Sequence, residues 1–453
     1  MNTLIAISLL GILCLLLEVF NLRKAIVPVT AVGLAATLVY TISLLGTNTS
    51  HYNNMVVTNK FTIGFSSLFI VLTLFLVLLS ADFYQKTAHK IADYVSIKIF
   101  LLAGGIAMVS FGNMAMFFLG LEILSISLYI LAGSNPLSLK SNEAGMKYFI
   151  MGSFASAVIL FGIALVYGAI GSFDVNQIYE ASHSASTVDW FYIGASMISV
   201  GMLFKIAAVP FHFWAPDVYE GAPALTTATM STLAKVVAIA AFFKLNRYLN
   251  GNMKEAYEVM LVVIAILSMT VGNIMALKQY NVKRILAYSG ISHAGFMLVS
   301  LLNVNLYAPT LFYYTIAYAT AGMAAFAVVI YVCKDKENED IEHFRGFGKQ
   351  NPVLGAVLTA ALLSMGGIPI FSGFFAKFFI FNEALHSHYT VLVVFGILNS
   401  IIAIGYYFRI IGTLFSGQSV TENKKIPLVY YLVALGAIAI NIGIGILPSI
   451  ITG

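Results

Sequence analysis

Long runs of apolar residues alternate with short polar stretches along the whole chain of 453 residues. Fourteen of these runs are long enough for a membrane-spanning helix, which needs about 20 mostly apolar residues. They lie near 2–21, 25–46, 61–81, 95–111, 113–133, 143–170, 190–211, 221–248, 256–276, 282–302, 307–332, 352–385, 390–415 and 427–449. Within them, apolar and polar residues do not alternate as they would in the strands of a transmembrane β-barrel. The pattern therefore predicts an all-α, polytopic membrane protein.

Two of the predicted helices, the seventh and the twelfth, are interrupted by proline inside polar motifs. The seventh contains LFKIAAVPFHFWAPDVYEGAP, around Pro210, and the twelfth contains MGGIPIFSGFFAKFF, around Pro369. Proline removes a backbone donor, and in hydrocarbon the freed carbonyl is tolerated only where protein or water satisfies it. Broken helices at corresponding positions of two halves are typical of transport sites. We therefore expect the functional centre near these two breaks.

The two breaks also indicate an internal repeat. Pro210 and Pro369 are 159 residues apart, and the same offset relates the fourth predicted helix to the ninth. Because five helices are an odd number, two consecutive five-helix repeats would have opposite orientations in the membrane. The repeat is incomplete in one respect, since this alignment sets Ser364, and not Lys377, opposite Lys205. The predicted units are 1–96 with helices 1–3, a first repeat over 97–248, a second repeat over 256–415, and the last helix in 416–453.

Composition excludes several classes of protein. Only 9% of the residues are charged and 60% are hydrophobic, whereas soluble domains carry about 25% charged residues. This excludes a cytosolic enzyme and a nucleic-acid binder. The two cysteines, Cys14 and Cys333, are too few for an iron–sulfur cluster, which takes about four thiolates. Since the sequence shows no phosphate-binding loop, dinucleotide motif or metal-ligand cluster, we expect no cofactor and no metal in this chain.

Lysine and arginine near the helix ends predict the orientation, because these cations concentrate in cytoplasmic loops. The N-terminal segment lacks the basic region and cleavage site of a signal peptide, so we expect a retained first helix. The loops after odd-numbered helices carry Arg23, Lys24, Lys86, Lys90, Lys98, Lys140, Lys278, Lys283, Arg284, Lys334, Lys336, Arg345, Lys349, Lys424 and Lys425. The opposite side carries Lys60, Lys244, Arg247 and Lys254. An even number of helices then places both termini in the periplasm.

Several ionisable residues lie within the predicted helices. They are Glu122, Lys147, Lys205, Lys235 and Lys377, with His212 and His293 as further candidates. Five charges at the bilayer centre would cost on the order of 10–15 kcal/mol at about 2.5–3.5 kcal/mol each. Desolvation favours the neutral form of a lysine and a nearby carboxylate favours the charged form. A lysine between these two influences can take up and release a proton, so these residues are candidates for a proton path.

Simpler interpretations remain open for each of them. Lys147 could extend its amine to the cytoplasmic surface along an apolar stem, and Glu122 could serve only as a hydrogen-bonding group between helices. The other three lysines could be structural, and the two histidines are equally consistent with satisfied core residues. His386 and His388 lie in a predicted loop, where two ligands alone would make a weak metal site.

Five segments resemble the antiporter-like subunits of respiratory complex I, the proton-translocating NADH:quinone oxidoreductase. They are FFLGLEILSISLYILAG, EAGMKYFIMGSFASAVILFGIALVYG, FKIAAVPFHFWAPDVYEGAPA, VKRILAYSGISHAGFMLVSLL and MGGIPIFSGFFAKF. Their order matches, the resemblance runs from about residue 60 onward, and PFHFWAPDVYEGAPA is highly specific to this superfamily. The chain is most similar to the bacterial N-type subunits. Lys377 stands where M-type subunits typically carry glutamate, and with the chain ending at Gly453 we expect no lateral helix of the L type.

The resemblance implies fourteen core helices, two inverted five-helix repeats and broken helices 7 and 12. It also implies a membrane-arm subunit that moves protons from cytoplasm to periplasm across the bacterial inner membrane. NADH-to-quinone electron transfer in other subunits would drive this movement. FMN, iron–sulfur clusters and quinone would accordingly belong to partner subunits, and this chain would hold no redox centre.

The resemblance also assigns roles within the proton path. Glu122 corresponds to a half-channel glutamate on the fifth helix, and Lys205 to its partner on the seventh. Lys235 corresponds to a connecting lysine on the eighth helix and Lys377 to the exit-side lysine on the twelfth. The remaining members of the path are Lys147 on the sixth helix and His293 on the tenth.

Two alternative functions remain open. The first is a subunit of a multisubunit cation/proton antiporter, which would share the fold but lack an NADH-oxidising partner. The second is a structural scaffold, in which apolar residues could replace the lysines without loss of proton movement.

Overall fold

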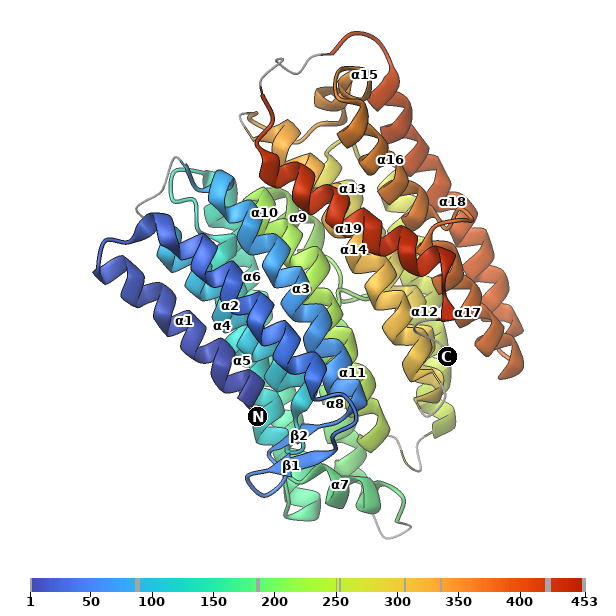
Figure 1. Ribbon diagram of the computed structural model, residues 1–453. Coiled ribbons are helices and arrows are strands. Elements are labelled where there is room, and N and C mark those ends of the chain that lie inside the picture. Colours follow the sequence, from blue (N-terminus) through green and yellow to red (C-terminus); the bar gives the residue numbers. More distant parts are fainter. Residues whose placement is uncertain are drawn as a thin grey trace.

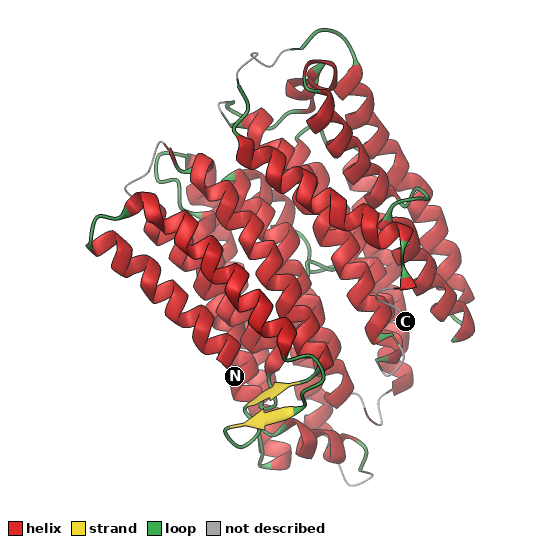
Figure 2. Ribbon diagram, in the orientation of Figure 1, coloured by secondary structure: helices red, strands yellow, loops and turns green. Residues whose placement is uncertain are grey.

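The computed structural model describes residues 2–85, 90–184, 188–249, 251, 254–304, 307–334, 336–419 and 425–449. Nearly all of this chain is helical, with one small hairpin (Figure 2). Within the described residues, twelve helices are long and apolar enough to cross a membrane. The all-α membrane architecture is therefore confirmed. The count by this measure is twelve, not fourteen, because the expected seventh and twelfth spans are broken into shorter helices.

The first part of the chain forms the helices drawn from blue to green in Figure 1. These are α1 (Asn2–Val19), α2 (Arg23–Ser43), α3 (Lys60–Phe83), α4 (Ile91–Ser110), α5 (Met114–Ala132), α6 (Leu139–Ile170), α7 (Val175–Ser182), α8 (Asp189–Lys205), α9 (Trp214–Gly221), α10 (Ala224–Thr229), the π-helical turn η2 (Met230–Ala234) and α11 (Lys235–Leu249). The hairpin strands are β1 (Thr49–His51) and β2 (Val56–Thr58), antiparallel, with Thr49 opposite Thr58 and His51 opposite Val56.

The second part forms the helices drawn from yellow to red. These are α12 (Lys254–Leu277), α13 (Val282–Leu298), the 3₁₀ turn η4 (Val299–Asn303), α14 (Ala308–Cys333), the 3₁₀ turn η5 (Ile341–Phe344), α15 (Phe347–Gln350), α16 (Pro352–Gly366), α17 (Ser372–His386), α18 (Thr390–Phe415) and α19 (Leu428–Ile446). The two parts meet where α3, α9 and α10 contact α13, α14 and α19.

Both predicted breaks are present. α8 ends at Lys205, and α9 begins only at Trp214, beyond Pro210. α16 ends at Gly366, and Gly367 follows with φ +86°, a left-handed conformation that favours glycine. The amide of Gly367 bonds the carbonyls of the preceding turn, which closes α16 before α17 begins. The proline and glycine signals therefore identified the breaks correctly.

The helices around these breaks form the centre of the molecule. The apolar windows of Ala224–Leu249 and Val282–Asn303 are completely buried inside the protein, and that of α14 is 94% buried. The windows of α1 and α2 are only 28% buried, and their exposed side chains, such as Leu9 and Val32, are apolar. Central helices thus provide a site screened by protein, and outer helices provide a lipid-facing surface.

Small residues let several helices approach closely. A Cβ on Gly104 of α4 would lie 2.8 Å from the carbonyl oxygen of Gly120 of α5, and the reverse distance is also 2.8 Å. Gly162 of α6 and Gly194 of α8 meet in the same way at 2.7 Å. In a bilayer, where the hydrophobic effect does not drive helices together, such close packing supplies the association energy.

The ends of the chain lie at one end of the helix bundle. In Figure 1 the start of α1 and the end of α19 lie toward the same end as the hairpin and α7, and α15 lies at the opposite end. We refer to these as the hairpin end and the α15 end. Of the predicted loop cations, Lys86 and Lys424 lie outside the described residues.

Candidate functional site

Lys205, the last residue of α8, is held by three hydroxyl groups. Its Nζ donates to Ser125 Oγ at 2.8 Å, to Ser156 Oγ at 3.2 Å and to the Tyr129 hydroxyl at 3.3 Å. Two of these groups lie on α5 and one on α6, so three helices converge on one amine. All of the acceptors are neutral.

Glu122 lies on α5 one turn before Ser125, on the side of the helix that faces Lys205. Its Oε1 is buried and has no hydrogen-bond partner among the described residues. No ion pair joins it to Lys205. The structure therefore brings the two residues to one helix face, but it does not pair them directly.

Lys147 belongs to an ionic network near the α15 end. Its Nζ lies 2.7 Å from Glu143 and 3.1 Å from Asp217, and its side chain is 42% exposed. Arg284 of α13 binds Asp217 at 2.8 Å and Glu220 at 3.0 Å. The network thus joins α6, the broken segment α9 and the start of α13. Lys147 contacts solvent and carboxylates, unlike the other lysines of the predicted path.

Asp217 lies in the short helix α9, outside the membrane-spanning helices, and is ionised by its cationic neighbours. Partial burial raises the pKa of Asp217, but hydrogen bonds from Arg284 and Lys147 outweigh this effect and hold the pKa below its usual value. The network is therefore ionic at neutral pH.

Lys235 begins α11 directly after the π-helical turn η2. It is 3% exposed, and its Nζ donates to the carbonyl oxygen of Gly290 of α13 at 2.7 Å. A π-turn leaves a backbone register that differs from the α-helix and is frequent at functional sites.

His293 lies one turn beyond Gly290 on α13 and is 5% exposed. Its Nδ1 is 2.7 Å from the hydroxyl of Tyr314, and its Nε2 is 3.4 Å from the hydroxyl of Tyr407. The ring also packs against Tyr318, with a centroid separation of 4.9 Å. Tyrosine hydroxyls from α14 and α18 therefore flank both ring nitrogens.

Lys377 of α17 is 5% exposed and lies just after the second break. Its Nζ donates to the carbonyl oxygen of Gly366 at 3.2 Å and lies 4.9 Å from the ring centre of Phe296. A cavity of about 10 Å³ lies next to it, close to the smallest space that holds one water. Its lining is His293, Tyr314, Ala317, Tyr318, Ser364, Met365, Gly373 and Ala376.

The structure thus gathers five of the six predicted path residues into two clusters, and places Lys147 in the separate ionic network. The first contains Glu122 and Lys205, and the second contains Lys235, His293 and Lys377. Among the described residues, no hydrogen bond links Lys205 to Lys235 directly. A connection between the clusters therefore needs water or side-chain movement.

The other histidines stand apart from both clusters. His212 lies in the first break and is 6% exposed, with its Nδ1 unpartnered among the described residues. His386 and His388 lie at the hairpin end of α17, and the described chain shows no group of three His, Cys, Asp or Glu side chains that could hold a metal.

Three lysines assigned to loops from the sequence are in fact buried within helices. Lys98 of α4 is 1% exposed and donates to Ser80 Oγ at 3.1 Å and to the Tyr84 hydroxyl at 3.2 Å. Lys283 of α13 pairs with Glu339 at 2.7 Å. Their partners could not be predicted from the sequence, because Lys98 and Lys283 lie at the ends of apolar runs, where a lysine ordinarily lies at the surface.

Lys244 of α11 is the third of these buried lysines. It donates to the carbonyl oxygens of Val109 at 2.9 Å and Phe111 at 2.5 Å. These carbonyls belong to the last turn of α4, so Lys244 satisfies groups that a helix end leaves without partners.

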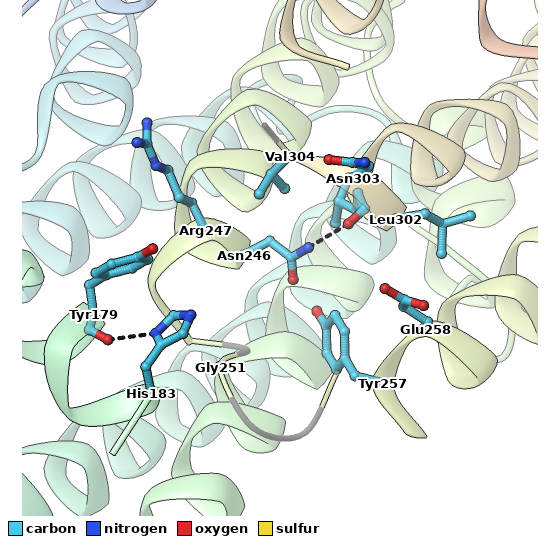
Figure 3. Close-up of a pocket in the computed structure, with 11 residues that line it drawn as sticks. Tyr179, His183, Asn246, Arg247, Gly251, Tyr257, Glu258, Leu302, Asn303 and Val304 are labelled. Carbon is cyan, nitrogen blue, oxygen red and sulfur yellow. Dashed lines mark hydrogen bonds between the residues drawn. The ribbon is translucent and has the colours of Figure 1, made fainter. Parts of the chain in front are cut away.

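A separate polar pocket opens at the hairpin end, between α7, α11 and α12. Figure 3 shows Tyr257 and Glu258 on one side and Asn246 and Arg247 on the other. Its volume is about 170 Å³, and none of the predicted path residues line it. It is therefore distinct from the two lysine clusters.

The sequence matches the protein family described as "NADH:quinone oxidoreductase/Mrp antiporter, TM" over residues 112–403. A protein of Flavobacterium johnsoniae named NADH-quinone oxidoreductase subunit N is 58% identical over 100% of this chain and 99% of its own length. The chain belongs to the family of NADH-quinone oxidoreductase N subunits. A second N subunit, from Cytophaga hutchinsonii, is 42% identical over 100% of this chain and 98% of its own length.

Two solved structures share the fold of this chain. A chain of respiratory complex I from Thermus thermophilus, solved with bound aureothin, superposes with a TM-score of 0.85. It is 28% identical over 99% of this chain and 97% of its own. A chain of the Mrp complex from Dietzia sp. gives a TM-score of 0.87 at 20% identity, over 99% of this chain and 94% of its own. The second likeness concerns the fold alone. The resemblance found in the sequence is thereby confirmed.

Proposed function

We propose that this N-family subunit carries protons across the bacterial inner membrane, from cytoplasm to periplasm, as part of a membrane arm. NADH-to-quinone electron transfer in partner subunits would drive the movement, and FMN, iron–sulfur clusters and quinone would be held there. The observation that carries the proposal is the set of three central lysines, Lys205, Lys235 and Lys377, whose hydrogen bonds all go to neutral oxygens.

Neutral acceptors suit a lysine that changes its protonation state. A carboxylate would hold the charged form, whereas hydroxyl and carbonyl oxygens accept a hydrogen bond from an ammonium or from a neutral amine. The surroundings therefore satisfy each lysine in both states. Lys98 and Lys244 also donate to neutral oxygens. The three proposed lysines differ from them in position, because they lie beside the helix breaks, Glu122 or His293.

The proposed path follows the two clusters. Glu122 and Lys205 receive protons from the α15 end, where Lys147 and its ionic network line the entrance. Within the second cluster, Lys235 receives the proton and passes it to His293 and Lys377. In this proposal water connects the two clusters, because no hydrogen bond among the described residues spans the interval.

The proposed orientation sets the hairpin end, with both termini, in the periplasm and the α15 end in the cytoplasm. It is supported by the excess of predicted loop cations near the α15 end, among them Lys349 and Arg345. We also propose that 97–248 and 256–415 are inverted repeats, because each contains one helix broken at membrane depth.

The experiment measures the assembled complex in vesicles, with NADH-driven quinone reduction and proton uptake recorded together. Lys205→Ala should lower both by about tenfold or more, since a positioned proton-transfer group contributes 10²–10⁴-fold. Lys349→Ala, at an exposed lysine of α15, is the control and should leave both unchanged. If an assembled Lys205→Ala complex keeps both activities, the proton-path proposal is wrong and a scaffold role replaces it.

The same experiment separates the antiporter alternative. A subunit of a cation/proton antiporter would exchange ions without NADH oxidation. The N-subunit relatives at 58% and 42% identity favour the oxidoreductase over this alternative. Isolation of the native assembly without NADH activity would reverse that preference.

A further inference from the structure

One face of α14, with the preceding residue Tyr307, carries a line of hydroxyl groups that the proposed path does not use. Tyr307, Thr310, Tyr314 and Tyr318 are spaced by three or four residues, so they lie along one side at the start of this helix. All four side chains are buried. A hydroxyl group both donates and accepts a hydrogen bond, so such a line can pass a proton where water or neighbouring groups connect its members.

The inner end of this hydroxyl line lies beside the second lysine cluster. A Cβ placed on Gly290 would be 2.9 Å from Nζ of Lys235 and 3.1 Å from the hydroxyl of Tyr318, so both groups face the same glycine. Tyr314 is in hydrogen-bond contact with His293. The cavity of about 10 Å³ is lined by both tyrosines and the histidine, which gives one water a place between them.

The outer end of the line meets Glu383 of α17. Thr310 Oγ1 donates a hydrogen bond to Glu383 Oε1. The Tyr307 hydroxyl donates to the backbone carbonyl of Glu383 at 2.8 Å and contacts Ser387 Oγ. The other carboxyl oxygen, Oε2, is buried and has no partner among the described residues. A buried carboxyl oxygen without a partner is costly, and a proton or a water relieves the cost.

The line of hydroxyl groups is about as long as half the thickness of the membrane's hydrocarbon layer, and it runs from the centre toward the hairpin end. From Tyr318 to Tyr307 the chain advances about 16 Å at 1.5 Å per residue, and half of the hydrocarbon layer measures about 15 Å. Lys235 lies midway along the buried span Ala224–Leu249, whereas Glu383 lies near the end of α17, toward the hairpin end (Figure 1).

We propose that Glu383 is a further proton-carrying residue, the last buried acceptor of an exit branch along α14. This inference rests on the proposed function. A proton released by Lys235 moves through water and the hydroxyls of Tyr318 and Tyr314 to Thr310. Thr310 gives its own hydroxyl proton to Glu383 and receives the incoming one. Glu383 becomes a neutral carboxylic acid, then releases that proton to water at the hairpin end, so the net change is one proton transferred.

The test uses the assembled complex in vesicles. Glu383→Gln keeps the size and the acceptor for Thr310 but cannot carry a proton, and it should lower NADH-driven proton uptake by about tenfold or more. Glu383→Asp should retain most of the activity. The matched control is Glu255→Gln, at an exposed residue in the first turn of α12, which should leave uptake unchanged.

A second pair of variants tests the connection without touching the carboxyl group. Thr310→Val removes the hydroxyl at nearly constant volume and should reduce uptake, whereas Thr310→Ser keeps the hydroxyl and should restore it. This pair decides the matter if Glu383→Gln fails to assemble. Infrared difference spectra of the working complex should show the C=O band of a protonated carboxyl that is lost in Glu383→Gln, which a structural role would not produce.

The outcomes distinguish the exit branch from the proposed function as a whole. If Lys235→Ala abolishes proton uptake while Glu383→Gln and Thr310→Val pump normally, the exit branch is wrong and the central path stands. If Lys235→Ala also pumps normally, the proposed function itself fails. Equal losses for Thr310→Val and Thr310→Ser would show that packing, and not the hydroxyl, matters at this position, and would overturn the branch.

Discussion

Replacement of Gly290 by alanine is a sharp test of how Lys235 works. Gly290 lies within α13, and its carbonyl oxygen accepts the hydrogen bond from Lys235 at 2.7 Å. An added Cβ would lie 2.9 Å from the amine, closer than such atoms are found. The amine lies at the far end of a flexible side chain, so it can move away at little structural cost. The substitution therefore displaces the proton-carrying group and leaves the backbone in place.

The substitution should lower the rate of proton transfer without lowering the stability of the complex. Hydrogen bonds to charged groups contribute about 1.5–3 kcal/mol, so their loss should slow proton transfer by roughly tenfold to a hundredfold. Alanine in a helix interior is favoured over glycine by about 1 kcal/mol, so the melting temperature of the complex should not fall. Function and stability should thus separate in one variant.

The assay is NADH-driven proton uptake by the assembled complex in vesicles, together with its melting temperature. Gly168→Ala is the control, because a Cβ on Gly168 of α6 would meet nothing within 4 Å. Proton uptake by Gly290→Ala at the rate of the unmodified complex would refute the reasoning. So would a fall in rate that is matched by a fall in melting temperature.

Two further predictions concern the charged groups near the α15 end. The pKa of Asp217 is lower in the folded protein than its ordinary value of about 3.9, so the ionised carboxylate stabilises the fold above that pH. This stabilisation is lost as the pH falls through the pKa of the folded protein. The melting temperature of the Asp217→Asn complex should therefore be lower than that of the unmodified complex at neutral pH, and the difference should shrink as the pH is lowered. A difference in melting temperature that does not change with pH would contradict this prediction. Lys334→Met should remove the ion-pair partner at 2.6 Å from the buried carboxylate of Asp82, which keeps the hydrogen bond from the Tyr430 hydroxyl at 2.7 Å. The free energy of unfolding should fall by about 3 kcal/mol. Adding Asp82→Asn should recover most of the loss in a denaturant titration, and a double variant as unstable as the single one would argue against an unpaired charge.

The positions of the helices could be predicted from the sequence because membrane insertion depends on local hydrophobicity. Each of the fourteen apolar runs corresponds to a helix or to a pair of shorter helices in the structure. The breaks at Pro210 and Pro369 could be predicted for the same reason, since a missing amide acts on its own turn. The number of candidate membrane spans in the described chain, twelve, differs from the predicted fourteen only where these breaks shorten a helix.

The surroundings of the lysines could not be predicted, because they come from distant parts of the chain. Ser125 and Ser156 reach Lys205 across 80 and 49 residues of sequence. Lys147 finds Asp217 across 70 residues. The hydrophobic periodicity of one helix does not show which face of another helix will pack against it. These hydroxyl and carboxyl partners therefore could not be predicted.

The burial of Lys98 and Lys244 also could not be predicted from the sequence. Each lies toward the end of an apolar run, where a lysine ordinarily extends its amine to the surface. Their burial depends on Tyr84 and on the end of α4, which only the folded structure brings to them. The π-turn before Lys235 likewise could not be predicted, because Met230–Ala234 contains no proline or glycine that would mark a change of helix type.

The burial of the lysine-bearing span Ala224–Leu249 has a consequence for biogenesis. This span is completely enclosed by protein, carries Lys235 and Lys244, and has the lowest hydropathy of the twelve candidate spans in the described chain. A lysine at the bilayer centre, such as Lys235, costs about 2.5–3.5 kcal/mol on the translocon scale, and the acceptors of Lys235 and Lys244 are carbonyls of α13 and α4. α4 is synthesised before this span, whereas α13 follows it. The segment must therefore stay close to the translocon, away from bulk lipid, until the next helices of the nascent chain have arrived.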